Sequence, residues 1–324
     1  MNCRWQNRAR RLAGVCISLL LLSGCSMMLP QTTALTDNRP ARLPDSAKLD
    51  VPFVPQDDNL CGPAALKMTM ASAGVDVTLD QLKNEVFVPG RQGSLQAEML
   101  AAPRRHGLIA YQLAPQLEDV LREVAAGTPV IVLQDYGVWP VSAWHYAVVV
   151  GYDYPKREAI LHSGLKADMR MPFAVLEYLW KQSHYWAMVT AAPDKVPATA
   201  KAANYVEAVA AVENLKDLQA ARAAYAASLR RWPDDDRAVL GLANTLYATG
   251  DFAKAEAVLR PAVERRPDSV VLLNNLAQTL SKLDRNAEAL TVIDRAAALG
   301  GPFSDAVQDT RREILRHTQA AALR

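Results

Sequence analysis

Two residues of this sequence, Cys61 and His145, are suited to covalent chemistry. Cys61 stands directly before Gly62 and Pro63. Because proline has the φ angle of a first helical turn, Cys61 is expected at or next to the N-cap of a helix. The free N–H groups and positive end of a helix lower the pKa of a thiol, and the thiolate is the reactive nucleophile. A histidine can accept and return a proton near neutral pH, so this pair indicates nucleophilic catalysis.

The sequence around both residues resembles a known family. Gln56 opens the motif Gln-x4-Cys-Gly-Pro-Ala-Ala-Leu, and His145 opens His-Tyr-Ala-Val-Val-Val-Gly-Tyr-Asp. Over residues 50–190 these motifs resemble the papain-like cysteine peptidases, in particular the double-glycine-leader, bacteriocin-processing peptidases. The resemblance implies that Cys61 is the nucleophile and that His145 is the general base and acid. It also implies that Gln56 lines the oxyanion hole together with the backbone N–H of Cys61.

The third catalytic position departs from that family, which orients its histidine with an Asp or Asn on the following strand. Asp153 is the nearest candidate in the sequence. It lies eight residues further along the strand of His145, about 26 Å away at about 3.3 Å per residue. Asp153 is therefore excluded, and the acid is missing from its expected place.

The strand that follows His145 offers two weaker substitutes for this acid. If the chain turns back at residues 155–156, a two-residue turn pairs position 149 with His162 and places His162 on the face of His145. A shift of one residue selects Ser163 instead, which is also where the family places its acid. The sequence leaves both residues open as the third position.

These residues need a mixed α/β framework to bring them together. Apolar spacing predicts helices over 63–73, 95–102, 117–126 and 173–181, the second of them stopped by Pro103. Short β-branched or apolar runs predict strands over 130–133, 146–150, 159–161 and 185–190. With the resemblance, this pattern predicts an α+β papain-like cysteine peptidase domain over residues 49–190.

The rest of the chain is repetitive and helical. After an Ala- and Pro-rich linker over 191–203, alanine recurs every 34 residues at Ala221, Ala255 and Ala289. A period of 34 residues is that of the tetratricopeptide repeat. We therefore expect an all-α tetratricopeptide-repeat domain of about three repeats over 204–302, followed by a capping helix over 303–324. Such a stack offers a concave surface for a protein partner and has no chemistry of its own.

The first residues are those of a targeting segment. Four arginines precede an apolar run that is too short to span a bilayer, which is typical of a signal peptide over 1–24. Its end, Leu-Ser-Gly-Cys, resembles the lipobox of bacterial lipoproteins, and this implies a diacylglycerol on Cys25. We expect residues 25–48 to form a lipidated tether. Ser26 favours a cell-envelope location in the outer membrane, facing the periplasm.

Composition and charge argue against several classes of function. The full chain has a net charge of +2, and removal of residues 1–24 leaves 32 basic and 34 acidic residues, a net charge of −2. No face needs to be strongly basic, so we expect no nucleic-acid partner. No metal-ligand spacing and no phosphate-binding Gly-x4-Gly-Lys motif occurs, so neither a metal nor another cofactor is expected. Once Cys25 is lipidated, Cys61 is the only free thiol.

Three functions remain open at this point. The first is a membrane-anchored cysteine peptidase, a hydrolase that cleaves a peptide or protein substrate through a Cys–His mechanism while the repeats recruit substrate or partner. The second is a catalytically degenerate peptidase fold that acts as an envelope scaffold or assembly lipoprotein, and the missing acid favours it. The third uses the same cysteine and histidine for amide or acyl transfer.

Overall fold

The computed structural model describes residues 29–322 with the exception of 57–58 and 139. The predicted signal peptide and Cys25 lie outside the described residues. The chain divides into two compact units, each described by itself below. The first unit comprises Met1–Ala102, Gln112–Thr190 and Pro197–Thr199, and the second comprises Pro103–Tyr111, Ala191–Val196 and Ala200–Arg324.

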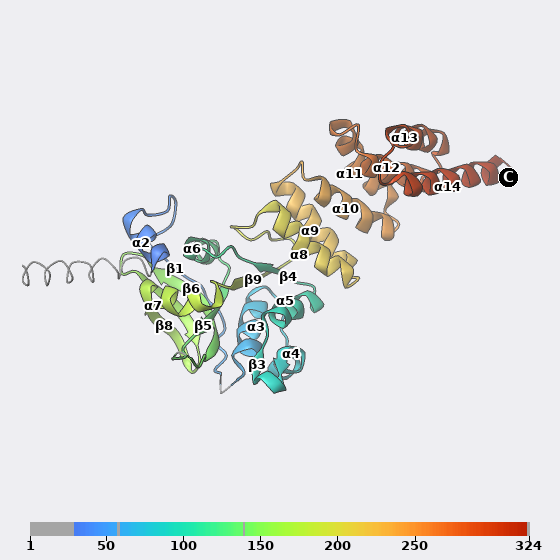
Figure 1. Ribbon diagram of the computed structural model, residues 1–324. Coiled ribbons are helices and arrows are strands. Elements are labelled where there is room, and N and C mark those ends of the chain that lie inside the picture. The colour runs from blue at the N-terminus through green and yellow to red at the C-terminus, as the bar shows by residue number, and fades with distance from the viewer. Residues whose placement is uncertain (1–28, 57–58, 139, 323–324) are drawn as a thin grey trace, which may run out of the picture. The chain divides into compact units, whose positions relative to one another are not determined.

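A seven-stranded sheet forms the centre of the α+β domain (Figure 1). The strands lie in the order β4-β9-β5-β6-β7-β8, and β1 pairs with the end of β6 that β5 does not reach. Strands β5, β6 and β7 are the predicted apolar runs, each extended by one to three residues at its ends. The bounds are β1 Ser46–Lys48, β4 Ile109–Gln112, β5 Val130–Asp135, β6 Trp144–Asp153, β7 Glu158–Ser163, β8 Lys166–Pro172 and β9 Ala187–Ala191, with a separate hairpin of β2 Phe87–Val88 and β3 Gly93–Ser94.

The helices of this domain agree with the predicted ones and add two more. The four predicted helices are α3 Cys61–Ser72, α5 Gln96–Arg105, α6 Leu117–Ala125 and α7 Phe173–Trp180. The prediction that Pro103 stops its helix is wrong, because α5 continues through Pro103 to Arg105. A proline this close to the end of a helix removes only one backbone hydrogen bond. The added helix α4 Leu79–Val86 begins at Thr78 with a capping box to Gln81, a pattern that marks the start of a helix.

The prediction of a tether over 25–48 is wrong for its described part. Residues Pro30–Asp37 form helix α2, and β1 pairs with β6. The buried carboxylate of Glu177 on α7 explains why α2 is fixed, since it accepts hydrogen bonds from the N–H groups of Gln31 (3.0 Å) and Thr32 (2.6 Å). These are two of the free N–H groups that begin the helix, where a negative charge is favourable.

The linker is also attached to the peptidase-like domain. Its residues 192–201 lie between β9 and the next helix, close to the predicted bounds. The buried carboxylate of Glu123 on α6 accepts hydrogen bonds from the N–H groups of Ala198 and Thr199 and from the Thr199 hydroxyl. Two buried glutamates therefore hold the two ends of this domain, Glu177 at α2 and Glu123 at the linker.

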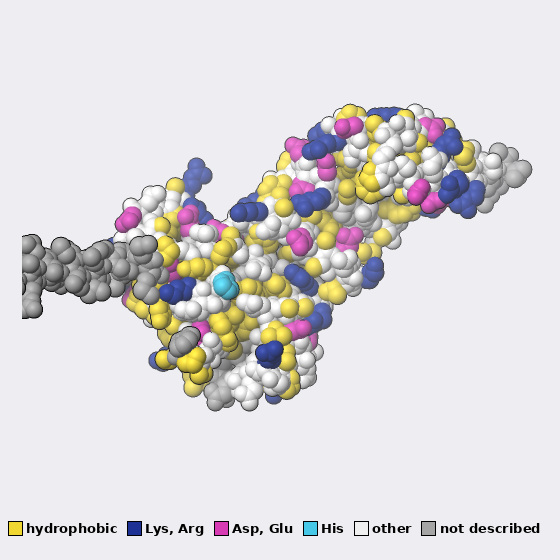
Figure 2. All heavy atoms as spheres, viewed as in Figure 1, with side chains coloured by type: hydrophobic (Ala, Val, Ile, Leu, Met, Phe, Trp, Pro, Cys, Tyr) yellow, Lys and Arg dark blue, Asp and Glu magenta, His cyan; other side chains and the backbone are white. Residues whose placement is uncertain are grey.

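The second unit contains three helix pairs and a last helix, as the 34-residue period predicts. The recurring alanines Ala221, Ala255 and Ala289 are fully buried, each on the second helix of its pair. Figure 2 shows basic and acidic side chains intermingled over the visible face of these helices. The bounds are α8 Ala202–Asn214, α9 Leu218–Arg231, α10 Asp236–Ala248, α11 Phe252–Arg265, α12 Val270–Lys282, α13 Asn286–Leu299 and α14 Ser304–Ala322. Within the described residues, none of the helices has the length and apolar character needed to cross a bilayer.

Candidate active site

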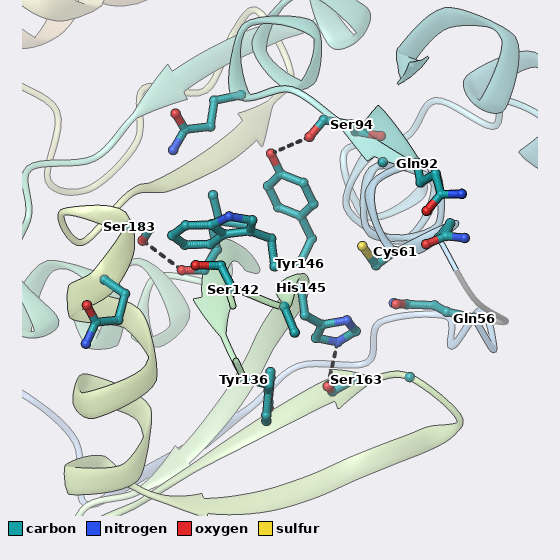
Figure 3. A pocket seen from close by; sticks show the side chains of 18 of the residues that line it. Gln56, Cys61, Gln92, Ser94, Tyr136, Ser142, His145, Tyr146, Ser163 and Ser183 are labelled. Atoms are coloured by element: carbon teal, nitrogen blue, oxygen red, sulfur yellow. Dashed lines mark hydrogen bonds between the residues drawn. The ribbon is translucent and has the colours of Figure 1, made fainter. Parts of the chain in front are cut away.

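Cys61, His145 and Gln56 line one cleft of about 1260 Å³ in the α+β domain (Figure 3). Three separate parts of the chain supply them: the segment before α3, the start of α3, and β6. The described lining contains no Asp or Glu. The remaining lining residues are Asn59, Arg91, Gln92, Gly93, Ser94, Leu95, Gln96, Leu133, Tyr136, Ser142, Ala143, Trp144, Tyr146, Ser163, Gly164, Leu165, Lys166, Met169, Gln182, Ser183 and His184.

Cys61 is the first residue of α3, and Leu60 is its N-cap. The thiol is free and partly buried. Burial raises its pKa above the ordinary value, and hydrogen bonds from the backbone N–H groups of Tyr146, Gly62 and Cys61 itself offset part of this rise. The expectation that the helix end lowers the pKa of Cys61 is therefore wrong for the protein without substrate. The cost of desolvating the thiolate outweighs its stabilisation by the N–H groups at the helix end. The same three N–H groups point at the place where a negative sulfur would form.

His145 is the second residue of β6 and lies in the same cleft. Its Nε2 atom is 2.9 Å from the Oγ of Ser163 on β7. In Figure 3 the Cys61 side chain lies on the other side of the imidazole ring from Ser163, so Nδ1 is the ring nitrogen left for the thiol. Burial lowers the pKa of His145. Both Cys61 and His145 are thus favoured in their neutral forms before a substrate binds.

The register between β6 and β7 selects Ser163 for the third position. The predicted register holds next to the turn, where Gly151 pairs with Ile160, but it fails beyond that point, because His162 pairs with Val148 rather than with position 149. The irregularity of the ladder between Val149 and Gly151 explains the shift, because an extra residue there moves every later pair by one. A shift of one residue exchanges the two faces of a strand, which brings Ser163 to His145 and turns His162 away.

His162 has a different role in the fold. It is buried, and its Nε2 atom is 3.0 Å from the carbonyl oxygen of Val51. Its Nδ1 atom accepts a hydrogen bond from the N–H of Asp168 at 3.2 Å. Because both ring nitrogens are used by the backbone, His162 holds the segment leading to Gln56 against β7 and the turn that follows it.

Gln56, the residue predicted to line an oxyanion hole, lies in the same cleft with a buried side chain. Its backbone N–H donates to the carbonyl oxygen of Gly164 at 3.1 Å, which fixes the residue beside the turn after Ser163. Its side chain is only 5% exposed. Neither the oxygen nor the nitrogen of its amide has a hydrogen-bond partner in the part of the chain that the structure describes. Leaving a buried amide unpaired is costly, and such groups occur where a ligand supplies the missing partner.

Two tyrosines of the site were not found from the sequence. Tyr136 packs edge-on against the His145 ring, with centroids 5.7 Å apart, and its hydroxyl donates to the side-chain oxygen of Gln134 at 3.3 Å. Tyr146 donates from its hydroxyl to the backbone oxygen of Ser94 at 3.2 Å. Tyr146 could have been recognised as a candidate because it directly follows His145 in the sequence. Tyr136 lies nine residues from His145 and no local pattern marks it. No group of three His, Cys, Asp or Glu side chains suited to a metal occurs among the described residues.

Two family models match separate parts of this chain. Residues 48–188 match a model described as "Peptidase_C39 like family". Residues 215–272 and 250–309 match a model described as "Tetratricopeptide repeat". The first range covers most of the α+β domain, and the second covers helices α9 to α13. No curated protein matches the chain.

Several solved structures are similar to one part or the other. A putative C39-like peptidase from Bacillus anthracis is 20% identical, with a TM-score of 0.39, and covers 48% of this chain and 100% of its own. A double glycine motif protease from an AMS/PCAT transporter, solved with its leader peptide, is 23% identical, with a TM-score of 0.35, and covers 44% and 93%. The TPR2B domain of yeast Sti1 in a pHsp70 complex is 21% identical, with a TM-score of 0.33, and covers 36% and 94%.

The predicted fold class is confirmed by the observed elements together with the two family matches. Most of the sheet, α3 and the cleft residues lie within the first match, and helices α9 to α13 lie within the second. The chain thus consists of a Peptidase_C39-like α+β domain followed by helices that match tetratricopeptide repeats.

Proposed function

We propose that this protein is a cysteine peptidase of the cell envelope that hydrolyses peptide bonds with Cys61 and His145. The observation that carries the proposal is the side-chain amide of Gln56, which has no hydrogen-bond partner among the described residues and is buried in the cleft that also holds the thiol and the imidazole. A scaffold has no need for a buried amide that lacks hydrogen-bond partners. In a peptidase, the oxyanion of the tetrahedral intermediate would be the missing partner.

The reaction follows from the orientation of the side chains. Nδ1 of His145 takes the proton of the Cys61 thiol as the sulfur attacks the substrate carbonyl carbon. The oxyanion accepts hydrogen bonds from the Gln56 amide nitrogen and the Cys61 backbone N–H. The imidazolium then protonates the leaving amine, which leaves a thioester that water hydrolyses. Since both groups are favoured neutral at rest, the proton moves during the attack rather than before it.

The N-terminal segment and the repeat unit bear on where the protein is located and what it binds. A diacylglycerol on Cys25 would anchor the protein, most simply in the outer membrane with the peptidase in the periplasm. The repeat unit would recruit a protein substrate or partner on its concave surface.

Cleavage of a peptide library by the purified full-length protein, with Cys61→Ala as its control, tests the proposed activity. We expect products that appear with the native protein and are absent with Cys61→Ala. If native protein of confirmed fold cleaves nothing while loss of the repeat unit abolishes cellular function, the scaffold alternative replaces the peptidase. Metabolic labelling with a fatty-acid probe, lost in Cys25→Ala, tests the anchor.

A further inference from the structure

Three consecutive residues, at and just after the end of β7, contact both halves of the candidate site. Ser163 lies 2.9 Å from Nε2 of His145. The carbonyl oxygen of Gly164 accepts from the backbone N–H of Gln56 at 3.1 Å. His162, which precedes them, is buried and turns its ring to the segment that leads to Gln56. One strand end therefore relates the position of the proposed base to that of the proposed oxyanion donor.

The segment that leads to Gln56 has few attachments of its own. At its start, the backbone N–H of Leu49 donates to β6 at 2.8 Å, and the next backbone N–H that donates is that of Gln56. Between them lie residues 50–55, of which two are prolines without an N–H to donate. Among the described residues, the bond between the His162 ring and the carbonyl oxygen of Val51 is the only hydrogen bond to residues 50–55. This histidine is therefore the polar contact that fixes the segment between its ends.

The backbone determines which ring nitrogen of His162 carries the hydrogen. Nδ1 accepts a hydrogen bond from the N–H of Asp168 at 3.2 Å, so Nδ1 has no hydrogen of its own. The ring hydrogen is then on Nε2, 3.0 Å from the carbonyl oxygen of Val51, which can only accept it. The ring of Phe53 also packs edge-on against the imidazole, with centroids 5.2 Å apart. His162 thus holds the segment by one hydrogen bond and one aromatic contact.

The side-chain amide of Gln56 depends on this support. Neither its oxygen nor its nitrogen has a hydrogen-bond partner among the described residues, so no polar contact of its own fixes where it points. The position of the amide is inherited from the backbone of the segment. Figure 3 shows the Gln56 side chain extending from this segment towards Cys61 and His145. Misplacing a catalytic group by about 1 Å can lower a rate by about 100-fold.

We propose that His162 is a positioning residue that holds the Gln56 amide in place for the oxyanion, through the carbonyl oxygen of Val51. The inference rests on the proposed function, because it concerns how the oxyanion donor of that reaction is held. A positioning role of this kind acts on the step that forms the oxyanion. It leaves the reactivity of the Cys61 thiol itself unchanged.

Two substitutions separate the two hydrogen bonds of His162. A glutamine side chain reaches as far as Nε2, and its NH2 group can donate to Val51. An asparagine reaches only as far as Nδ1, where its oxygen can accept from the N–H of Asp168. For a library-selected peptide we expect His162→Asn to lower kcat at least about tenfold with little change in KM, and His162→Gln to stay within about threefold of native. His317→Asn, the same substitution at a hydrogen-bonded histidine of the repeat unit, is the control.

Alkylation of Cys61 distinguishes positioning from general damage. Iodoacetamide reacts at a saturated carbon and forms no oxyanion, so His162→Asn should be alkylated at the native rate. Adding His162→Asn to Gln56→Ala should lower kcat no further, because the amide to be positioned is gone. Equal losses of kcat and alkylation rate in His162→Asn overturn the proposal, and so does a further tenfold loss in the Gln56→Ala background. A folded His162→Gln protein that loses as much kcat as His162→Asn overturns it as well.

Hydrogen exchange of the Gln56 backbone N–H, followed by NMR in labelled full-length protein, tests the support without any cleavage. We expect faster exchange in His162→Asn and native exchange in His162→Gln. Native exchange in both variants overturns the proposal. Failure of the proposed peptidase shows differently: the native protein would then cleave no peptide, whereas faster exchange in His162→Asn alone would still identify His162 as the group that positions Gln56.

Discussion

The Nε2 atom of His145 and the Oγ atom of Ser163 face each other at 2.9 Å across the neighbouring strands β6 and β7. A hydroxyl can form this hydrogen bond in place of a carboxylate, but it adds no negative charge to stabilise the imidazolium. Burial therefore lowers the pKa of His145 without opposition. The cleft thus holds a thiol and an imidazole that are both favoured in their neutral forms.

The pH dependence of Cys61 alkylation should reflect this neutral pair. The pKa of His145 is lowered, so it loses its proton below the ordinary value of about 6.5, and the pKa of Cys61 is raised above about 8.5. As pH increases, we expect the iodoacetamide rate to rise in two steps. The first lies below the ordinary imidazole value, where His145 becomes a base, and the second lies above the ordinary thiol value, where Cys61 itself ionises. His145→Gln should keep only the second step. A single step between the two ordinary values would contradict the assignment.

The oxyanion role of Gln56 predicts opposite effects on activity and stability. Removing one such donor typically lowers kcat by about 10²–10³-fold. In Gln56→Ala we expect a loss of that size in the cleavage of a library-selected peptide, with little change in KM. Because both amide atoms are buried without partners among the described residues, their removal should leave the urea-unfolding midpoint unchanged or higher.

The comparison variant is Gln92→Ala, which removes an amide side chain from another part of the same cleft. Its kcat should stay within about threefold of the native value. A Gln56→Ala protein that loses stability but keeps its kcat would show that the amide is structural and that the oxyanion is held elsewhere.

The sequence marked Cys61, His145 and Gln56 as candidates because each stands in a short motif, and the structure places all three in one cleft. The Cys-Gly-Pro start of α3 is one example: Pro63 favours the first helical turn whatever the rest of the chain does. The 34-residue period is another, since a buried alanine is required at the same position of each repeat. In both cases the residues and the element they form are neighbours in the chain.

The features that sequence reasoning missed depend on distant contacts. The choice between His162 and Ser163 rests on one irregular pair in the β6–β7 ladder, which no turn signal at residues 155–156 reveals. Helix α2 carries no N-cap side chain of its own and is fixed by Glu177, which is 145 residues away from Thr32. The raised pKa of Cys61 likewise follows from how deeply the folded domain buries α3, and helix-end arguments alone cannot include that burial.

Glu177 should be a strong determinant of order in the N-terminal segment. It is fully buried, and its two carboxylate oxygens accept from Gln31 and Thr32. Glu177→Gln replaces one acceptor by an NH2 group that faces a backbone N–H, and we expect a loss of about 1–3 kcal/mol in unfolding free energy. Limited proteolysis should then cut residues 30–45 faster. Glu118→Gln, in an exposed pair with Arg122, should change stability by less than about 0.5 kcal/mol. Equal effects of the two variants would argue against the carboxylate as the anchor of α2.

Gly241 on α10 tests the packing of the repeat unit, because two opposing effects act there. Alanine gains up to about 1 kcal/mol over glycine inside a helix. An added Cβ at this position, however, would lie 2.3–2.5 Å from three ring atoms of Tyr225, which is itself buried on α9 and donates to Glu213 at 2.7 Å. Such a contact requires the ring or the helix to move, at a cost of about 1–3 kcal/mol, so steric strain should outweigh helix propensity. We expect Gly241→Ala to lower the unfolding free energy, with Gly90→Ala, where an added Cβ meets nothing within 4 Å, as the neutral control. A Gly241→Ala protein that is more stable than the native one would mean that α9 and α10 can move apart at little cost.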